Sequence, residues 1–444
     1  MHMNTTMTTD QTLGRIRRYI PKSIFNFFNP AYHFSLAFLS ALWYRFPSRQ
    51  IKIIAITGTK GKSSTGELVS AILEQAGYKT ALSNTIRFKI GDQSRPNLFK
   101  MSMPGRGFMQ KFIRDAVKAK CDYAVIEMTS QGSLLFRHRF INIDTFIVTN
   151  ISPEHIEAHG SYENYVAAKM AIGHQFERSR KNNKTLIVNG DDAEAKKFLT
   201  LHADQKITYR LAEAKPYSLL ENGVEFNYDC VRIQSRLSGL FNIYNMLAAI
   251  KATETRAIDL KKIVTALRNF TVISGRMEHI KVAGSANAGT TQNFDVIVDY
   301  AHTVDSLKKA YTAAQTGRTG KLIGVLGGTG GGRDKWKRKE MGKVAAQYCN
   351  YIVLTNEDPY DEDPMQIIND VKEGVVEVWK KEPTVILDRR LAIRDAISHA
   401  QKDDVVIITG KGTDPFIMGP NGENTPWSDA KVAREELERL AKKE

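Results

Sequence analysis

The sequence predicts an α/β protein with two parallel-sheet domains that follow a short N-terminal helical segment. From Ile51 onward, apolar runs of strand length alternate with helical patterns, as expected for a parallel sheet covered by helices. A second series of such runs begins at Phe294. The chain has 444 residues, which is more than one hydrophobic core normally supports. We therefore predict an N-terminal segment at 1–50, a central domain at 51–274 and a C-terminal domain at 275–444.

The expected strands are short apolar runs. In the central domain they lie at 53–57, 123–128, 145–150 and 185–189, and in the C-terminal domain at 294–299, 321–326, 351–355 and 404–409. The break between the domains is expected near Ser274 and Gly275. The stretch of small residues at 283–293 predicts an exposed hairpin loop just beyond that break.

The first strand leads into a glycine-containing loop that predicts phosphate binding. Its backbone N–H groups would close on phosphate oxygens, and the helix that follows would point its positive dipole end at the anion. Lys62 would reach the terminal phosphates and the Ser63 hydroxyl would lie on Mg²⁺. Gly58 is closer to Lys62 than in the usual phosphate loop, so an ordinary structural turn is the alternative. The loop comprises Gly58, Thr59, Lys60, Gly61, Lys62, Ser63 and Ser64.

Composition restricts the classes of partner. The formal net charge of +15 indicates an anionic ligand or surface, but the basic residues are scattered rather than gathered in one tract. ATP and an acidic substrate would account for the charge, and no nucleic-acid-binding module is recognisable. The cysteines Cys121, Cys230 and Cys349 lack metal-ligand spacing, which favours reduced thiols in a cytoplasmic protein.

The N-terminal segment is rich in aromatic residues and is flanked by Arg17, Arg18, Arg45 and Arg49. Its unbroken apolar stretch, 33–44, is shorter than the roughly 20 residues that a membrane-spanning helix needs. Within the segment 20–46, apolar residues recur at helical spacing. That spacing predicts a helix docked on the next domain, and we prefer docking to a helix that lies in a membrane interface. The recurring residues are Leu36, Leu39, Leu42 and Trp43.

Three polar residues follow the strands of the central domain. Glu127 ends one expected strand, and its carboxylate would need a metal or an ion pair in such apolar surroundings. An ordinary salt bridge is the alternative. His155 follows another strand end and would supply an imidazole to a metal, although a lone histidine is more often structural. Lys169, from its sequence context alone, is one more solvated lysine.

Taken in order, the motifs resemble those of the Mur ligase family, specifically its tripeptide-synthetase branch. The resemblance covers about residues 51–444. It rests on ITGTKGKSS, EMTSQG, TNISPEHIEAHGSYENYVAAK, SGRMEHI, VDYAHTVDSL, GGGRDKWKR, TNEDPYDEDP and GKGTD.

The resemblance implies an enzyme that forms an amide bond with ATP through an acyl phosphate. Lys62 and Thr59 would hold phosphates, while Ser63 and Glu127 would bind one Mg²⁺. His155 and Lys169 would serve a second Mg²⁺. In the family, lysines at the position of Lys169 react with CO₂ to form a carbamate, which converts a cation into a carboxylate-like metal ligand.

The C-terminal domain resembles the family's closing lid. By this likeness Arg276 contacts nucleotide phosphates at the hinge, although an arginine beside a glycine is usually solvated. Asp299, Tyr300 and His302 resemble the nucleotide-contacting strand end of the family. Capping of the helix that follows is the alternative role for Asp299.

Two departures from the family pattern concern the substrates. The branch that adds diaminopimelate has Asn and Arg where this chain has Asp358 and Tyr360. A phenol cannot pair with a carboxylate in the bidentate manner of guanidinium, so diaminopimelate is disfavoured and a cationic amino acid such as lysine or ornithine is the hypothesis. The usual Gly-His-Glu ending is Gly-Thr-Asp here, preceded by Lys411 and ending at Asp414.

The second departure is at the N-terminus, where residues 1–50 lack the family's uridine-binding pattern. Ser102, before Met103-Pro104-Gly105, resembles the loop that meets the muramoyl substrate. We predict a cytoplasmic, monomeric ligase that adds an amino acid to a UDP-muramoyl-peptide acceptor. The alternatives are a lipid-linked muropeptide acceptor, a polyglutamate or cyanophycin-like peptide acceptor, and a nucleotide-gated scaffold without catalysis.

Overall fold

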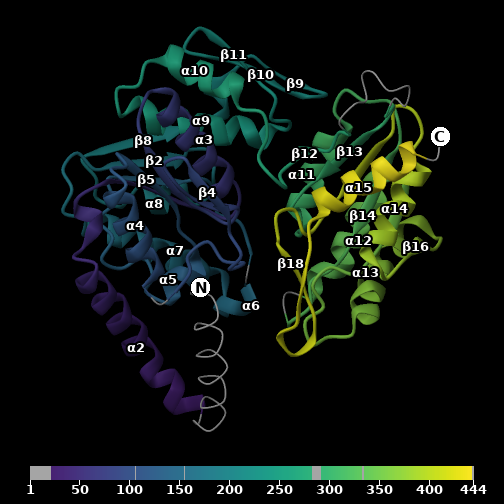
Figure 1. Cartoon of the computed structure of the whole chain (residues 1–444), viewed down its shortest axis with the longest axis horizontal. Coiled ribbons are helices and arrows are strands. Elements are labelled where there is room, and N and C mark those ends of the chain that lie inside the picture. The colour runs from purple at the N-terminus through teal and green to yellow at the C-terminus, as the bar shows by residue number, and fades with distance from the viewer. Residues whose placement is uncertain (1–21, 106, 155, 283–291, 333–334, 443–444) are drawn as a thin grey trace.

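The computed structural model describes residues 22–442 apart from 106, 155, 283–291 and 333–334, and describes side chains from residue 28 onward. Two α/β bodies lie side by side, and within the described residues helix α2 (Lys22–Trp43) precedes them (Figure 1). The predicted fold class is confirmed, because each body is built on a mainly parallel sheet. The predicted hairpin loop at 283–293 falls mostly outside the described residues.

The first body contains an eight-stranded sheet with the order β4-β3-β2-β5-β1-β6-β7-β8. Strands β3 and β4 are antiparallel to their neighbours, and the other pairs are parallel. The strands are β1 (Lys52–Thr57), β2 (Thr80–Ser83), β3 (Arg87–Ile90), β4 (Gln93–Pro96), β5 (Tyr123–Glu127), β6 (Thr145–Val148), β7 (Thr185–Asn189) and β8 (Gln205–Tyr209).

Continuous apolar runs form these strands because both faces of the sheet are covered. Along β1, Ile54 and Ile56 belong to one core, and Ile53 and Ala55 to the other. Helices α3, α9 and α10 pack in the first core, and α4, α7 and α8 in the second. The helices are α3 (Lys62–Gln75), α4 (Phe108–Lys118), α5 (Ser130–Leu134), α6 (Ile156–His159), α7 (Tyr162–Glu177), α8 (Ala195–Phe198), α9 (Leu240–Glu254) and α10 (Leu260–Asn269).

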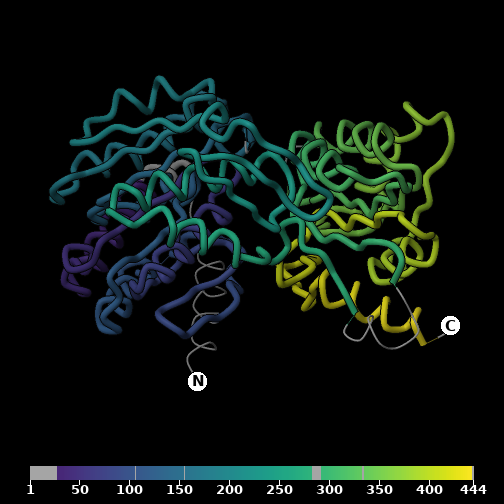
Figure 2. The backbone as a smooth tube through the Cα atoms, turned by 90° about the horizontal axis from the view of Figure 1, so that it is seen from above, coloured from purple at the N-terminus to yellow at the C-terminus, as the bar shows by residue number. Residues whose placement is uncertain are grey.

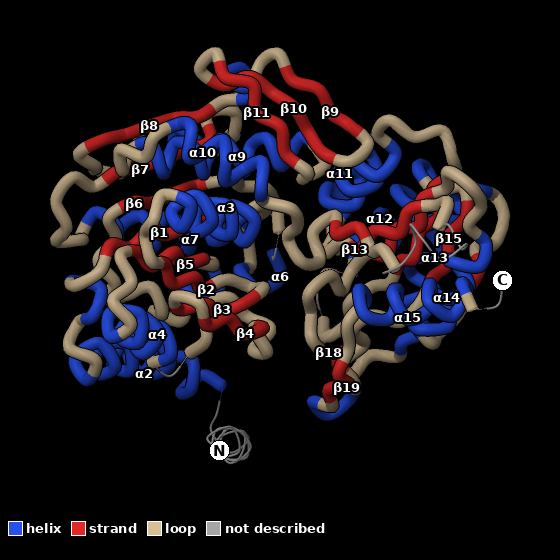
Figure 3. Tube along the Cα trace, turned by 45° about the horizontal axis from the view of Figure 1, so that its top comes forward, coloured by secondary structure: helices blue, strands red, loops and turns tan. Residues whose placement is uncertain are grey.

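A small antiparallel sheet sits over α9 and α10 at one edge of this body (Figure 3). It consists of β9 (Tyr217–Leu220), β10 (Gly223–Tyr228) and β11 (Val231–Ser235). Val224, Phe226 and Ile233 point from it into the first core. The inward residues alternate with outward ones, as expected when only one face of a sheet is covered.

The second body is a six-stranded sheet with the order β12-β13-β17-β14-β15-β16, in which only β12 is antiparallel to its neighbour. Helices α11–α13 cover one face, and α14 and α15 cover the other. The elements are β12 (Glu278–His279), β13 (Asp295–Val298), α11 (Val304–Gln315), β14 (Leu322–Leu326), α12 (Trp336–Tyr348), β15 (Tyr351–Leu354), α13 (Pro364–Trp379), β16 (Thr384–Val385), α14 (Arg389–His399), β17 (Val405–Ile408), β18 (Phe416–Met418), β19 (Asn424–Pro426) and α15 (Asp429–Ala441).

The connection between the two bodies is close to the predicted domain break. The backbone of Gly275 adopts φ +60 and packs against Gly412, where a Cβ would meet main-chain atoms at 2.5 Å. Glycine is required there because an L side chain has neither the conformation nor the space. Figure 2 shows the tube passing from one body to the other. The domain limits themselves stay a prediction.

The N-terminal helix α2 (Lys22–Trp43) docks by a different face from the one the sequence indicated. Its contacts are made by Phe34 and Phe38, which pack edge-on against Phe140 in the loop after α5, and by fully buried Ala41. The residues whose spacing predicted docking are mostly outside: Leu39, Leu42 and Trp43 are 59%, 53% and 81% exposed. The described helices include none long and apolar enough to cross a bilayer.

Candidate active site at the carboxyl ends of the strands

The loop between β1 and α3 is shaped by two glycines. A Cβ on Gly58 would lie 1.9 Å from the Thr149 hydroxyl oxygen, and one on Gly61 would lie 2.3 Å from Asn245 Oδ1. Gly61 also has φ +82 and occupies the N-terminal cap of α3. Because the N-terminal cap residue is a glycine, no side chain caps the first N–H groups of α3. Uncapped N–H groups at a helix start are the arrangement that binds an anion.

Lys62 is curled back over this loop. Its Nζ donates to the carbonyl oxygens of Gly58 at 3.0 Å and Thr59 at 2.9 Å. Burial lowers the pKa of this ammonium, although the charge of Glu127 acts in the opposite direction. An ammonium whose hydrogen bonds go to carbonyl oxygens at the start of a helix can exchange them for a phosphate oxygen, which is a stronger partner.

Glu127 and Ser63 are in direct contact at the end of β5. The Ser63 hydroxyl donates to Glu127 Oε2 at 2.6 Å, and Lys62 Nζ lies 4.0 Å from Oε1. Burial raises the pKa of Glu127, but the Lys62 charge and the hydrogen bonds outweigh it and leave the pKa below its usual value. A buried, ionised carboxylate beside a hydroxyl is an oxygen donor set that fits Mg²⁺. The alternative role of Glu127, an ordinary salt bridge, describes only its contact with Lys62 and leaves out its hydrogen bond from Ser63.

Two further hydroxyl residues complete the surroundings of Glu127. Ser102 Oγ donates to Oε1 at 2.9 Å, and Thr85 contacts both carboxylate oxygens through its N–H and its hydroxyl. Ser102 was expected at the substrate, and it lies here beside the predicted metal ligand. Thr85 was not predicted. Thr85 follows the end of β2, which is parallel to and paired with β5, so the two strand ends are neighbours. That position is the signal that would have indicated Thr85 as a site residue.

Lys169 is 2% exposed on α7 and points at the phosphate loop. Its Nζ donates to the Gly58 carbonyl at 2.6 Å, and the ammonium lies 4.8 Å from the centre of the Tyr165 ring. Burial first, and then the charge of Lys62, lowers its pKa well below the ordinary lysine value. This lysine is therefore not a solvated surface residue. A lower pKa increases the share of the neutral amine, which is the nucleophilic form.

His155 lies outside the described residues, so the predicted second metal site has only Lys169 as a described ligand. Among the residues that are described, no cluster of three or more His, Cys, Asp or Glu side chains is positioned to hold a metal. Both residues predicted for the first metal site, Ser63 and Glu127, are described and are in contact.

The two domains meet at Glu154. Lys60 Nζ lies 2.7 Å from Glu154 Oε1, and His302 Nε2, from the other domain, lies 3.6 Å from the same oxygen. Arg276 stacks on Tyr300 with its guanidinium carbon 4.2 Å from the ring centre. These C-terminal side chains thus face the phosphate loop. Glu154 was not singled out from the sequence, although it belongs to the segment that contains His155.

Asp299 is engaged with backbone groups. Its carboxylate accepts hydrogen bonds from the N–H of Met277 and of Ala301, both at 2.8 Å. Burial raises its pKa despite the nearby charge of Arg276. Thr303, not Asp299, caps α11. Asp299 therefore fixes the turn that carries Tyr300 and His302.

The residues predicted to meet the amino acid form an ion-pair cluster. Lys411, which has no exposed surface, lies 2.7 Å from Asp358 Oδ1 and 3.3 Å from Asp414 Oδ2. Lys100, from the central domain, lies 2.8 Å from Asp358 Oδ2 and 3.2 Å from Asp414 Oδ2. Burial opposes ionisation of Asp358, but the two ammonium groups hold its pKa below the usual range. Lys100 was missed because nothing near it in sequence marks it.

Tyr360 occupies the turn after this cluster with φ +53. Its N–H donates to the Met418 carbonyl at 3.0 Å, and its ring covers Gly331. Gly330 serves the same packing, since a Cβ there would lie 2.1 Å from the Pro359 carbonyl oxygen. Close backbone packing therefore accounts for glycine at 330.

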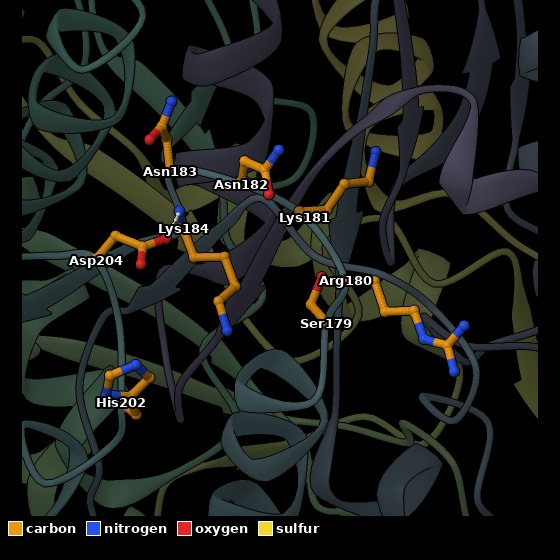
Figure 4. Close-up of a pocket in the computed structure, with 8 residues that line it drawn as sticks. All are labelled: Ser179, Arg180, Lys181, Asn182, Asn183, Lys184, His202 and Asp204. Carbon is orange, nitrogen blue, oxygen red and sulfur yellow. Dashed lines mark hydrogen bonds between the residues drawn. The ribbon is translucent and has the colours of Figure 1, made fainter.

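A polar hollow lies between α7 and β7, at the amino ends of the strands and so opposite the phosphate loop. Figure 4 shows the residues that line it. Its residue Lys181 donates to the carbonyl of Ile51, just before β1 begins, whereas the phosphate loop follows the end of β1. Ligands of open parallel sheets bind at the carboxyl ends of the strands, so this hollow is not the active-site candidate. It is lined by Ser179, Arg180, Lys181, Asn182, Asn183, Lys184, His202 and Asp204.

Comparison with known families gives two matches that together span most of the chain. Residues 56–253 match the Mur ligase middle domain, and residues 275–412 match the Mur ligase, glutamate ligase domain. Both matches include parts of the site described above.

Curated relatives match across the same length. UDP-N-acetylmuramoyl-L-alanyl-D-glutamate--2,6-diaminopimelate ligase 1 of Clostridium acetobutylicum is 34% identical over 87% of this chain and 78% of its own length. The diaminopimelate ligase of Clostridium botulinum is 36% identical over 86% and 77%. The UDP-N-acetylmuramyl-tripeptide synthetase of Roseiflexus is 32% identical over 91% and 82%.

Solved structures show the same architecture. A UDP-N-acetylmuramoyl-L-alanyl-D-glutamate--2,6-diaminopimelate ligase is 28% identical, with a TM-score of 0.59 over 88% of this chain and 79% of that one. Folylpolyglutamate synthase of Mycobacterium tuberculosis, complexed with ADP, has a TM-score of 0.68 over 86% and 92%. At 16% identity, this second likeness concerns the fold alone.

Proposed function

The chain belongs to the Mur ligase family, and we propose that it uses ATP to join a carboxylate of a UDP-muramoyl peptide to the amino group of an amino acid. One observation carries the proposal. At the carboxyl ends of the strands lie the phosphate loop, the Ser63–Glu127 pair and Lys169. His302 of the other domain reaches Glu154 at the same place. The first step needs the nucleotide and the carboxylate to be held next to each other, which a site between two domains provides.

The reaction requires activation of a carboxylate. A carboxylate oxygen of the acceptor attacks the γ-phosphorus of ATP, ADP leaves, and an acyl phosphate forms. The amine then attacks the carbonyl carbon, loses a proton, and inorganic phosphate leaves with the electrons of the broken C–O bond. Lys62 and the N–H groups of the loop would hold the phosphate oxygens, which gather negative charge in both steps.

Ser63 and Glu127 would hold Mg²⁺, which neutralises charge on the β- and γ-phosphates when it is bound. Lys169, as the carbamate, would add an anionic ligand for a second ion together with His155. The contact of His302 with Glu154, which Lys60 holds from within the central domain, would help to keep the two domains closed, and closure excludes water that would otherwise hydrolyse the acyl phosphate.

We infer that the amino acid is a diamino acid without a second carboxylate, such as lysine or ornithine. The curated relatives include diaminopimelate ligases, but Tyr360 offers no guanidinium to a distal carboxylate. Asp358 already has two ammonium partners, so a cationic side chain would have to displace Lys100, whose side chain is 18% exposed, rather than fully buried Lys411.

Phosphate release by the purified chain tests the function. The acceptor is UDP-N-acetylmuramoyl dipeptide, combined in turn with lysine, ornithine, diaminopimelate or a neutral amino acid, with products identified by mass. We expect release coupled to a new amide, with lysine or ornithine giving the highest kcat/KM. Preference for diaminopimelate would overturn the inference from Tyr360. No release with any pair, while ATP still binds, would overturn the proposed acceptor.

Glu127→Gln tests the metal ligand in the same assay. The amide keeps the size and accepts hydrogen bonds at one atom only, so we expect kcat to fall by about 10²-fold or more. Glu177→Gln, at the half-buried C-terminal end of α7 where the carboxylate pairs with His174, is the control and should change kcat by less than about twofold. Titration with Mg²⁺ should show a higher requirement in Glu127→Gln, and an unchanged requirement would contradict the assignment.

A cytoplasmic monomer remains part of the proposal, since ATP is supplied in the cytoplasm and the site is assembled from residues of one chain. Light scattering of the purified protein checks the oligomeric state.

A further inference from the structure

Helix α2 has apolar residues on two faces, and the described part of the domain packs against one of them, where Phe34 and Phe38 each stay 42% exposed. Phe34, Phe38 and Ala41 pack on the loop after α5 and on the start of α4, where the Ser40 hydroxyl comes close to Gly107. In Figure 1 the first turns of α2 extend beyond the body of the domain. The docked face fixes the orientation of the helix, and so it also fixes which residues face outward.

The outward face carries a stripe of large apolar side chains. Tyr32 lies seven residues before Leu39, and Leu42 and Trp43 lie three and four residues after it, which places all four on one side of the helix. No Lys, Arg, Asp or Glu occurs between residues 23 and 44, so no charged side chain of α2 interrupts the stripe. The stripe consists of Tyr32, Leu39, Leu42 and Trp43, each more than half exposed. An exposed stripe of this kind marks an interaction surface.

The surroundings of the stripe are basic. The sequence contains no Asp or Glu between residues 11 and 66. Exposed Arg45 and Arg49 follow α2 directly, and α4, which packs beside α2, adds Lys111, Arg114 and Lys118. Asp115 is the one acidic residue on α4, and it is paired with Lys111. The partner of this surface is therefore expected to be negatively charged.

We propose that this outward stripe and its basic border bind the headgroup layer of an anionic bilayer, with α2 lying in the plane of the membrane. Tyr32 and Trp43 have the amphipathic rings that favour such an interface, and Arg45 and Arg49 are placed to meet lipid phosphates. A second copy of the chain is a poorer partner, because each copy carries a net charge of +15 and would repel the other. The proposal does not depend on which substrates the ligase uses.

Sedimentation of the full chain with vesicles tests the proposal. We expect binding to phosphatidylcholine vesicles that contain about one third phosphatidylglycerol, weaker binding in high salt, and much weaker binding to phosphatidylcholine alone. Emission from Trp43 should shift to the blue on binding, and Trp43→Phe should lose most of that shift. No binding to anionic vesicles would overturn the proposal.

Variants distinguish vesicle binding by the α2 stripe from nonspecific binding by exposed apolar residues elsewhere on the chain. The triple variant Leu39→Ser, Leu42→Ser, Trp43→Ser should weaken vesicle binding by on the order of 100-fold, and Arg45→Gln with Arg49→Gln by about tenfold. The matched control is Leu220→Ser, Val231→Ser, Val272→Ser, which removes exposed apolar side chains elsewhere and should bind like the unaltered protein.

The variants should keep their ATP affinity and thermal midpoint, because the altered side chains are exposed. Equal losses in the control triple variant would overturn the assignment to α2. The membrane proposal would also be overturned if the chain did not bind vesicles but formed a concentration-dependent dimer that the α2 triple variant lost. The partner of the stripe would then be a second copy of the chain.

Discussion

Replacing Lys169 with alanine is expected to abolish amide formation while leaving ATP bound. The lysine amine touches the loop only through the Gly58 carbonyl, so its loss removes one hydrogen bond from the nucleotide site. Its proposed carbamate, in contrast, would hold charge that develops during phosphoryl transfer. We expect kcat to fall by about 10³-fold and the Kd for ATP to change by less than about threefold. Calorimetric titration with a non-hydrolysable ATP analogue, beside the phosphate-release assay, measures both.

Carbamylation adds a separate expectation. CO₂ adds to the neutral amine, a proton leaves, and the lowered pKa of Lys169 favours the neutral amine. Removing CO₂ from the buffer should therefore lower activity, and bicarbonate should restore it. Lys184→Ala is the matched control. Lys184 is also buried, but it lies just before β7 begins and donates to the Glu177 carbonyl, whereas the phosphate loop follows the end of β1. A Lys169→Ala enzyme with normal turnover would refute the role, and a nucleotide-gated scaffold would be favoured instead.

Lys411→Met should cause a large loss of stability. Lys411 has no exposed surface and pairs with both Asp358 and Asp414, so methionine leaves two poorly solvated carboxylates without their buried partner. We expect the free energy of unfolding to fall by about 3–5 kcal/mol. Urea unfolding followed by circular dichroism measures the change. Lys100 remains beside both carboxylates and limits the loss.

The pH dependence of this effect has a defined sign. The folded-state pKa of Asp358 is below its ordinary value of 3.8, so the pair contributes its full stability above that value and loses it as pH falls through the folded-state pKa. The penalty of Lys411→Met should thus be largest near neutral pH and shrink in acid. A penalty that does not depend on pH would show that packing, and not charge, is the cause.

An exposed pair provides the comparison. Lys339→Met removes a partner of Glu373 at the surface and should cost less than about 1 kcal/mol. Combining Lys411→Met with Asp358→Asn should recover part of the loss, because the uncompensated charge is removed. If the double variant were less stable than the sum of the single ones, the ion pair would not be the source of the effect.

The central strands of both sheets and the glycine-containing loop after β1 were predictable from sequence because local pattern determines them. Runs such as 123–128 and 404–409 became β5 and β17, since a strand covered on both faces is apolar along its whole length. Gly58 and Gly61 likewise serve conformations and close approaches that other residues do not allow. The roles of Lys169 and Arg276 came from resemblance alone, because neither residue stands out in its local sequence.

The tertiary structure alone decided which distant residues meet. Thr85 and Ser102 join Glu127, and Lys100 reaches Asp358 across 258 residues of sequence, because separate strands and two domains bring their ends to one place. It also decided which face of α2 is covered. That helix has apolar residues on more than one side, so its pattern specifies a helix but not an orientation, and contact with Phe136 and Phe140 selects Phe34 and Phe38 over Leu39 and Trp43. Sequence thus determined the elements that have a strong local pattern, and burial against a partner surface determined which side chains they bring to a site.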